Sequence, residues 1–269
     1  MKKKASTLLL MLILLIGLSL LLYPTLSEFW NSFHQSRAIA GYVETMVTID
    51  NDQYEEILQS AKDYNANFKR ESLWYLTEEE MPVYEAQLNI YGDGVMGYIE
   101  IPKIDCALPI YHGTSESVLQ IAVGHIEGSS LPVGGDSTHC VLSGHRGLPS
   151  AKLFTNLDQM VDGDLFMLYV LDEVFTFEVD QIRIVEPDDV SALSIEEGEE
   201  LCTLVTCTPY GVNSHRLLVR GHRVDNVHVS HVRVTADAIQ LDETVVALAV
   251  GIPLLMLFLL WVLIRYRKR

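Results

Sequence analysis

Two apolar segments, one near each end of the chain, constrain its fold more than any other feature. Residues 7–24 (TLLLMLILLIGLSLLLYP) carry no charge and follow three lysines at 2–4, and residues 245–264 precede four basic residues within 265–269. Each segment is close to the roughly 20 residues that a helix needs to cross a bilayer. Because the basic flanks lie at the outer ends, the positive-inside rule predicts two transmembrane helices with both termini in the cytoplasm. The middle of the chain, residues 25–243, is then extracellular.

A cleaved signal peptide is the alternative interpretation of the first apolar segment. The small-residue triplet at 38–40 (Ala-Ile-Ala) comes well beyond the apolar core, whereas a cleavage site follows the core closely. A retained anchor is therefore the expectation. Pro253 in the second segment is compatible with a membrane helix.

The charge of the middle segment excludes some classes of partner. Seven of the 19 Lys and Arg lie in the two flanks, so twelve face all 36 Asp and Glu, a formal charge of −24. Such a surface argues against binding nucleic acid or anionic lipid headgroups. A solvated acidic face is sufficient to explain it. The 219 residues from 25 to 243 are enough for one well-cored domain and a smaller appendage.

From residue 92 onward the chain is dominated by short strand-like runs. Pro, Gly, Asp and Asn separate these runs at short intervals. Eight such runs favour a closed or nearly closed β-barrel. The stretches 115–124 and 151–160 are expected to be short helices between strands. The runs are 96–101, 107–111, 139–143, 165–170, 174–179, 182–185, 201–207 and 216–224.

The N-terminal part of the middle segment is expected to be helical. Within residues 26–68, the stretch 51–63 (NDQYEEILQSAKD) spaces its apolar side chains at helical intervals. The fold class is then mainly β: a barrel with short inserted helices, a helical N-terminal appendage and a transmembrane helix at each end. The expected segments are a cytoplasmic tail at 1–6, a transmembrane helix at 7–24, the helical region at 25–91, the barrel at 92–228, a linker at 229–244, a transmembrane helix at 245–264 and a second cytoplasmic tail at 265–269.

Cys207 ends an alternating run, LCTLVTC (201–207). The two-residue period of a strand puts Cys207 on the same face as Val205 and puts Cys202 on the opposite face. A Thr-Pro pair follows and stops the strand, because proline has no N–H to donate. A thiol at that point faces a loop and is accessible to a substrate. A lone cysteine is more often a small core residue, so its position alone leaves both interpretations open.

Two further residues supply what a nucleophilic thiol needs. His145, in HCVLSGHRG (139–147), also ends a short apolar run before a turn and suits a proton acceptor. Arg216 starts the run after the loop TPYGVNSH, so a hairpin would bring it beside Cys207 to hold negative charge. A solvated histidine and a surface arginine paired with an acid are the alternatives. Five other histidines also stay open by pattern: His112, His125, His139, His215 and His222.

The motifs around these residues are long and specific. SGHRGLPSAKLFTNLD (143–158) and TLVTCTPYGVNSHRLLVRGHR (203–223) strongly resemble the signatures of the sortases, in particular the pilus-building class C. GDGVMGYIEIPKI (92–104) and LPIYHGTS (108–115) resemble the opening strands of that family's barrel. The resemblance covers roughly residues 90–225 and implies an eight-stranded β-barrel. A C-terminal membrane helix is also a class C trait.

The resemblance implies a role for each site residue. Cys207 is the nucleophile, His145 the general acid and base, and Arg216 the arginine that holds the substrate and the oxyanion, with Thr206 assisting the substrate or oxyanion. The implied reaction cleaves an LPxTG-type sorting signal between Thr and Gly through a thioacyl-enzyme and transfers the acyl group to a lysine amine of a pilin subunit. The implied partners are LPxTG-bearing pilin or surface proteins and the cell membrane. No cofactor, metal or nucleic acid is expected.

Two other functions stay open. A housekeeping sortase would use the same three residues to attach surface proteins to cell-wall peptidoglycan. A membrane-tethered binding or structural β-domain that has lost activity is the alternative outside the enzymes.

Class C sortases usually carry a lid with an Asp-Pro-aromatic motif that covers the cysteine. No such motif occurs between residues 60 and 92. Several alternatives therefore remain. The lid is built around Leu73 and Trp74, or it is reduced, or it is absent; or the segment is a plain helical spacer with Trp74 packed on the barrel. The redox state of Cys106, Cys140 and Cys202 also stays open, because their spacing is irregular and contains no CxxC.

Overall fold

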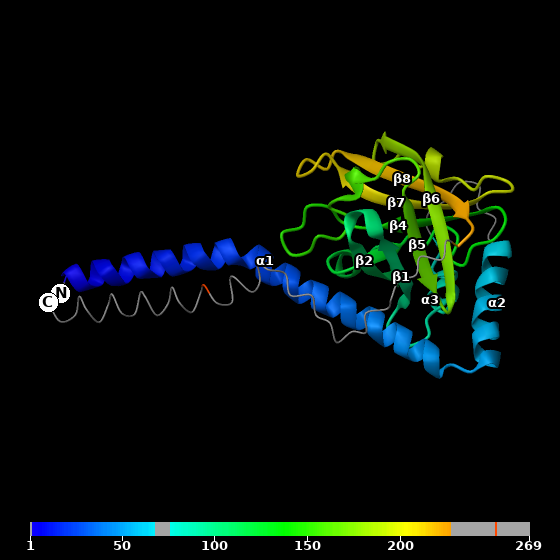
Figure 1. Cartoon of the computed structure of the whole chain (residues 1–269), viewed down its shortest axis with the longest axis horizontal. Coiled ribbons are helices and arrows are strands. Elements are labelled where there is room, and N and C mark those ends of the chain that lie inside the picture. The colour runs from blue at the N-terminus through cyan, green and yellow to red at the C-terminus, as the bar shows by residue number, and fades with distance from the viewer. Residues whose placement is uncertain (1, 68–75, 227–250, 252–269) are drawn as a thin grey trace. The chain divides into compact units, whose positions relative to one another are not determined.

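Eight strands close into a barrel (Figure 1). The computed structural model describes residues 2–67, 76–226 and 251, with side chains from residue 11 onward. The strand order around the barrel is β1-β2-β3-β4-β7-β8-β6-β5, and closure leaves no unpaired sheet edge. The strands are β1 (Val95–Ile101), β2 (Cys106–His112), β3 (Val123–His125), β4 (Thr138–Ser143), β5 (Leu165–Val170), β6 (Glu173–Val185), β7 (Glu200–Thr208) and β8 (His215–Val224).

The barrel predicted from the sequence is confirmed, with two differences in its strands. The runs 174–179 and 182–185 form the single long strand β6, whose pairing with β8 shifts register between Val179 and Gln181. The three-residue strand β3 was not predicted. It lies at the end of the 115–124 stretch, where the helix α4 (Glu116–Leu119) has only one turn. The predicted number of strands, eight, therefore equals the observed number, although β6 was predicted as two strands and β3 was not predicted.

The stretch 151–160 was expected to be a short helix, and within it only Leu157–Gln159 is helical, as one 3₁₀ turn in an otherwise irregular segment. Its apolar side chains Phe154 and Leu157 are fully buried in the core, and Leu153 has a positive φ of 41°. The helical spacing of the apolar residues thus arises from an irregular segment that contributes five side chains to the core: Ala151, Leu153, Phe154, Leu157 and Met160.

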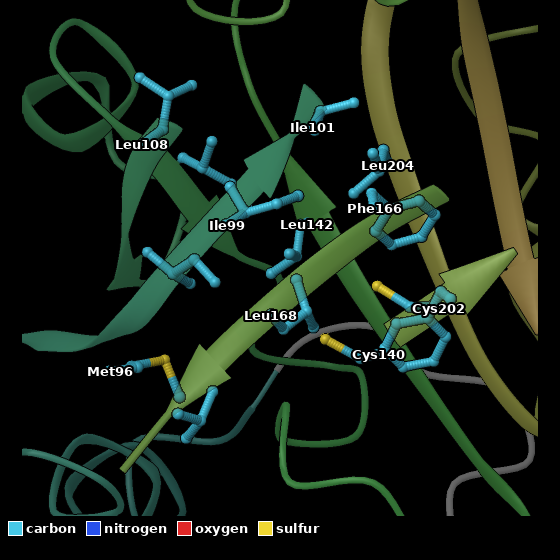
Figure 2. Packing of buried hydrophobic residues seen from close by; sticks show 14 of the residues in the cluster. Met96, Ile99, Ile101, Leu108, Cys140, Leu142, Phe166, Leu168, Cys202 and Leu204 are labelled. Carbon is cyan, nitrogen blue, oxygen red and sulfur yellow. The ribbon is translucent and has the colours of Figure 1, made fainter. Parts of the chain in front are cut away.

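Because side chains alternate along each strand, apolar clusters form on both faces of the sheet. The larger cluster fills the barrel, and Figure 2 shows Ile99, Leu142, Phe166 and Leu204 converging from different strands. The smaller cluster lies on the other face of β4, β7 and β8 and is made of Val141, Leu193, Val205 and Leu218. We call this second face the outer face.

All four cysteines lie within the described residues, and all are free thiols. Cys140 and Cys202 are directly opposite each other on β4 and β7, and both sulfur atoms point into the core (Figure 2). Burial raises the pKa of the Cys202 thiol well above its usual value and raises that of Cys106 to about 12. Cys207 is half-buried. Exposure therefore separates Cys207 from the two buried thiols at Cys140 and Cys202.

The first helix, α1 (Lys2–Thr48), runs through Pro24 without a break. Within the described residues it is the one helix long and apolar enough to cross a membrane, over Met11–Thr48, which agrees with an N-terminal membrane anchor. The second predicted membrane segment, 245–264, lies outside the described residues except for Gly251.

Residues 30–228 form one compact unit, in which the later part of α1 packs on the barrel. Tyr42 is 4% exposed, and its hydroxyl donates to the Met96 carbonyl (3.1 Å) and accepts from the Leu171 N–H (2.6 Å). The helix α2 (Asn51–Asn67) buries Leu58 and Ala61 against the core. The N-terminal appendage is thus part of the barrel's packing.

Tyr84 of the short helix α3 (Met81–Glu85) anchors the chain that leads into the barrel. Its side chain is buried, and its hydroxyl accepts a hydrogen bond from the Gly113 N–H (3.0 Å) and bonds to His125 Nδ1 (2.9 Å). Burial raises the pKa of this phenol far above its usual value, so the hydroxyl stays neutral. The ring also stacks on that of His125.

Replacing Tyr84 with Phe tests this anchor. The change leaves the buried His125 Nδ1 and the half-buried Gly113 N–H without their partner, so we expect the free energy of unfolding to fall by about 1–3 kcal/mol. The measurement is chemical denaturation of the full chain in detergent micelles, followed by circular dichroism. The matched control is Tyr91→Phe, an exposed tyrosine, for which the change stays within about 0.5 kcal/mol. Equal denaturation midpoints for Tyr84→Phe and the wild type would contradict the anchor.

Candidate active site

The register of β7 and β8 brings Cys207 and Arg216 together. The two strands are antiparallel, and Cys207 is paired directly with Arg216 at their hairpin end. Two positions further in, Val205 is paired with Leu218, and both belong to the outer-face cluster. Because side chains alternate along a strand, Cys207 and Arg216 lie on this same outer face. The hairpin expected from the sequence is present.

The guanidinium of Arg216 is held by the hairpin loop. Its Nη1 donates to the carbonyls of Asn213 (3.3 Å) and His215 (3.1 Å). Asn213 has a positive φ of 59°, a conformation that asparagine tolerates better than most residues. The loop therefore fixes one end of the arginine fork at the level of Cys207.

His145 reaches the same end of the sheet through the parallel pairing of β4 with β7. The last paired residues are Ser143 and Val205, and His145 and Cys207 each lie two residues beyond them. One backbone contact continues the alignment, because the Gly144 N–H donates to the Val205 carbonyl (3.0 Å). The His145 carbonyl accepts from the Phe154 N–H of the segment that follows (3.1 Å). Parallel strands end at the same edge, so the two loops that follow them start side by side.

Glu116 is a neighbour of His145 that the sequence did not indicate. Its Oε2 lies 3.8 Å from His145 Nε2, and its Oε1 accepts a hydrogen bond from Gln120 Nε2 (2.5 Å). The carboxylate is 74% exposed and the imidazole 28% exposed. A contact this exposed is screened by solvent, so it contributes little to the stability of the fold. The sequence did not predict this contact, because Glu116 is 29 positions away from His145.

Thr206 lies beside this group with its side chain on the opposite face from Cys207. It is 2% exposed, and its hydroxyl donates to the Gly144 carbonyl (2.7 Å). This bond joins the residue before His145 to the residue before Cys207.

The other histidines are held elsewhere. His125 and His139 are buried, and burial lowers the pKa of His112 and of His139. His215 is paired with Thr208, one position from Cys207, and contacts Glu186 at 3.3 Å. His222 lies further along β8, opposite Leu201. Among the described histidines, His145 is the one that follows β4 at the level of Cys207.

Leu73 and Trp74, the residues around which a lid was considered, lie outside the described residues.

Comparison with known proteins identifies the family. The sortase domain family matches residues 99–224. Sortase D of Bacillus subtilis is 30% identical over 189 residues, which cover 69% of this chain and 92% of the relative. The structure of sortase C1 from Streptococcus agalactiae has 55% identity and a TM-score of 0.69, over 71% of this chain and 100% of that one. The structure of sortase C from Streptococcus pneumoniae, reported with insights into pilin substrate specificity, has 45% identity and a TM-score of 0.64, over 71% of this chain and 97% of that one.

The site has a half-buried cysteine beside an arginine at the strand ends of a closed eight-stranded barrel. Together with these similarities, it leads to one conclusion. The chain belongs to the sortase family of cysteine transpeptidases, and its structural neighbours are sortase C enzymes.

Proposed function

We propose that this chain is a class C sortase whose nucleophile is Cys207 and which joins pilin subunits covalently. The observation that carries the proposal is the convergence of Cys207, Arg216 and His145 at one end of the outer face, on β7, β8 and the loop after β4. Sortases act on LPxTG-type sorting signals of surface and pilin proteins. The identity of 45–55% to the two sortase C structures supports the pilus role over the housekeeping alternative.

In the first half-reaction, the Cys207 thiolate attacks the carbonyl carbon of the Thr–Gly bond. The C–N bond breaks as the tetrahedral intermediate collapses, and His145 gives its proton to the leaving glycine amine. The product is a thioacyl-enzyme with the threonine carbonyl on Cys207. The half-buried thiol supports this role, because a nucleophile must be reached by its substrate.

In the second half-reaction, a lysine amine of another pilin subunit attacks the thioester. His145, now neutral, accepts the proton of that amine, and the thiolate of Cys207 leaves. An isopeptide bond has formed, and the enzyme has returned to its first protonation state. The exchange of one amide bond for another through a thioester conserves atoms, electrons and charge, so it requires no reactant besides the sorting signal and the lysine amine.

Arg216 holds the charge that develops on the carbonyl oxygen. Its direct pairing with Cys207 supports this role, since a guanidinium stays protonated throughout and presents its donors in a fixed plane. Thr206 assists only indirectly, because its side chain is buried on the opposite face from Cys207. Its hydrogen bond to Gly144 holds the backbone around the thiol in place.

The proposed location is the outer side of the cell membrane. Apolar helices at 7–24 and 245–264 would anchor the chain at both ends, with both termini in the cytoplasm. The acidic middle segment would then meet secreted pilins as they emerge. The apolar helix near the N-terminus supports the first anchor.

Replacing Cys207 with Ala tests the nucleophile. We expect the wild-type chain in detergent micelles to form a thioacyl adduct with an LPxTG peptide, and Cys207→Ala to form none. Mass spectrometry of the intact chain measures the adduct. The matched control is Cys202→Ala, on the opposite face of β7 and fully buried, which keeps the adduct. An adduct on Cys207→Ala, or none on the wild type, would refute the assignment.

Replacing Arg216 with Lys tests oxyanion stabilisation. The ammonium keeps the positive charge but loses the planar fork, so we expect kcat to fall by about 10²-fold. Peptide cleavage by the full chain measures kcat and KM, and thermal unfolding checks that the fold is retained. An unchanged kcat in a folded Arg216→Lys variant would remove Arg216 from the reaction.

An acceptor assay separates the pilus role from the housekeeping role. The enzyme is given an LPxTG-bearing pilin together with triglycine, which mimics a peptidoglycan cross-bridge. We expect covalent pilin multimers on denaturing gels, with Lys isopeptide bonds in their tryptic peptides, because the neighbouring structures are sortase C enzymes. A pilin whose acceptor lysines are changed to Arg serves as the control. Transfer to triglycine without multimers would favour the housekeeping role.

A further inference from the structure

Arg146 is a buried arginine next to the proposed catalytic histidine. Its side chain is 8% exposed and forms an ion pair with Asp158. Its Nη1 donates to Thr208 Oγ1 at 3.4 Å, and its guanidinium carbon lies 5.8 Å from the centre of the Tyr210 ring. One side chain thus contacts the loop after β4 and the loop after β7.

These contacts connect the immediate neighbours of the two reacting groups. Arg146 follows His145 in the chain, and Thr208 follows Cys207. The Arg146 guanidinium therefore links the chain directly after His145, the proposed general base, to Thr208, the residue directly after the proposed nucleophile Cys207. Their separation in sequence is 62 positions.

The surrounding loop is built to hold this bridge. Gly147 has a positive φ of 77°, and a Cβ there would lie 3.0 Å from the Tyr210 ring, closer than ordinary contact. Its N–H donates to Thr155 Oγ1 (3.1 Å). The absence of a side chain at Gly147 lets Tyr210 approach the loop and cover the guanidinium.

Stability alone does not explain an arginine here. The Arg146 side chain loses most of its hydration, whereas Asp158 is 47% exposed, so solvent screens the attraction between the two charges and the pair contributes little to stability. Within the described residues, the buried Nε of Arg146 also has no hydrogen-bond partner, which adds a cost. A planar fork with several donors suits a bridge between two loops better than it suits a core.

We propose that Arg146 is a positioning residue that fixes His145 and Cys207 relative to each other by joining their loops through Asp158, Thr208 and Tyr210. The proposal rests on the proposed function, since it concerns the geometry of the same reaction. Arg146 acts through its neighbours and need not touch the substrate. Its loss should slow the chemical step and leave substrate binding nearly unchanged.

The test compares Arg146→Met and Arg146→Lys in the full chain in detergent micelles, with an LPxTG peptide as substrate. For Arg146→Met we expect kcat to fall by about 10–100-fold, because small misplacements of reacting groups carry penalties of this size. KM should stay within about threefold, the signature of a contribution made in the transition state. Rates are normalised to the folded fraction measured by circular dichroism.

Arg146→Lys separates positioning from stability. Lysine keeps the charge opposite Asp158 but cannot reach Thr208 and Tyr210 with a planar fork. We expect it to restore the thermal midpoint to the wild-type value while kcat stays about tenfold low. The pair Arg146 and Thr208 is tested with Thr208→Val, which should lower kcat in the wild type and have no further effect in Arg146→Met.

Arg223 provides the matched control. It combines an ion pair to Glu200 (3.2 Å) with a ring contact to Phe175 (5.3 Å), and it lies seven positions from Arg216 along β8. Arg223→Met should lower the thermal midpoint and leave kcat unchanged. The inference would be overturned if Arg146→Met keeps the wild-type kcat per folded enzyme, or if Arg146→Lys recovers that kcat fully. It would also be overturned if Thr208→Val lowers kcat by the same factor in Arg146→Met as in the wild type, or if Arg223→Met loses as much kcat as Arg146→Met. A wild type that forms no adduct would instead overturn the proposed function.

Discussion

The parallel pairing of β4 with β7 is the constraint on which the site depends. Most neighbouring strands of this barrel are antiparallel, so the end of one strand lies beside the start of the next. In the β4–β7 pair both strands run the same way and both end at the same edge. His145 and Cys207 therefore leave the sheet together although 62 positions separate them. The hairpin to β8 then adds Arg216 from the antiparallel side.

The sequence was most informative where structure depends on local patterns. The alternation in 201–207 and the turn residues after it predicted a strand, its two faces and the hairpin that pairs Cys207 with Arg216. Strand β3 was missed because it has three residues, one of them Gly124, and exists only through pairing with β2 and β4. A Cβ at Gly124 would lie 2.3 Å from the Gly113 carbonyl oxygen, so this glycine reflects a close approach that no local pattern shows.

The supporting residues of the site could not be predicted for the same reason. Asp158 contacts Arg146 from the 3₁₀ turn Leu157–Gln159, and Thr208 contacts it from the end of β7. Glu116 approaches His145 from the helix α4. Each has an ordinary appearance in the sequence, because acids and threonines are common on surfaces. Only the closed barrel brings their loops to one end. The proposed catalytic residues were recognisable from their motifs, whereas the positions of their neighbours depend on tertiary contacts.

The unequal burial of the four thiols has a consequence for chemical labelling. Cys140 and Cys202 are enclosed in the core, and the pKa of Cys106 is raised to about 12, which keeps that thiol neutral and unreactive near neutral pH. We therefore expect a polar electrophile added to the native chain to reach the half-buried Cys207, the proposed nucleophile, before the enclosed thiols of Cys140 and Cys202. The unmodified protein offers a built-in attachment point for fluorophores, spin probes or covalent inhibitors, without removal of the other cysteines.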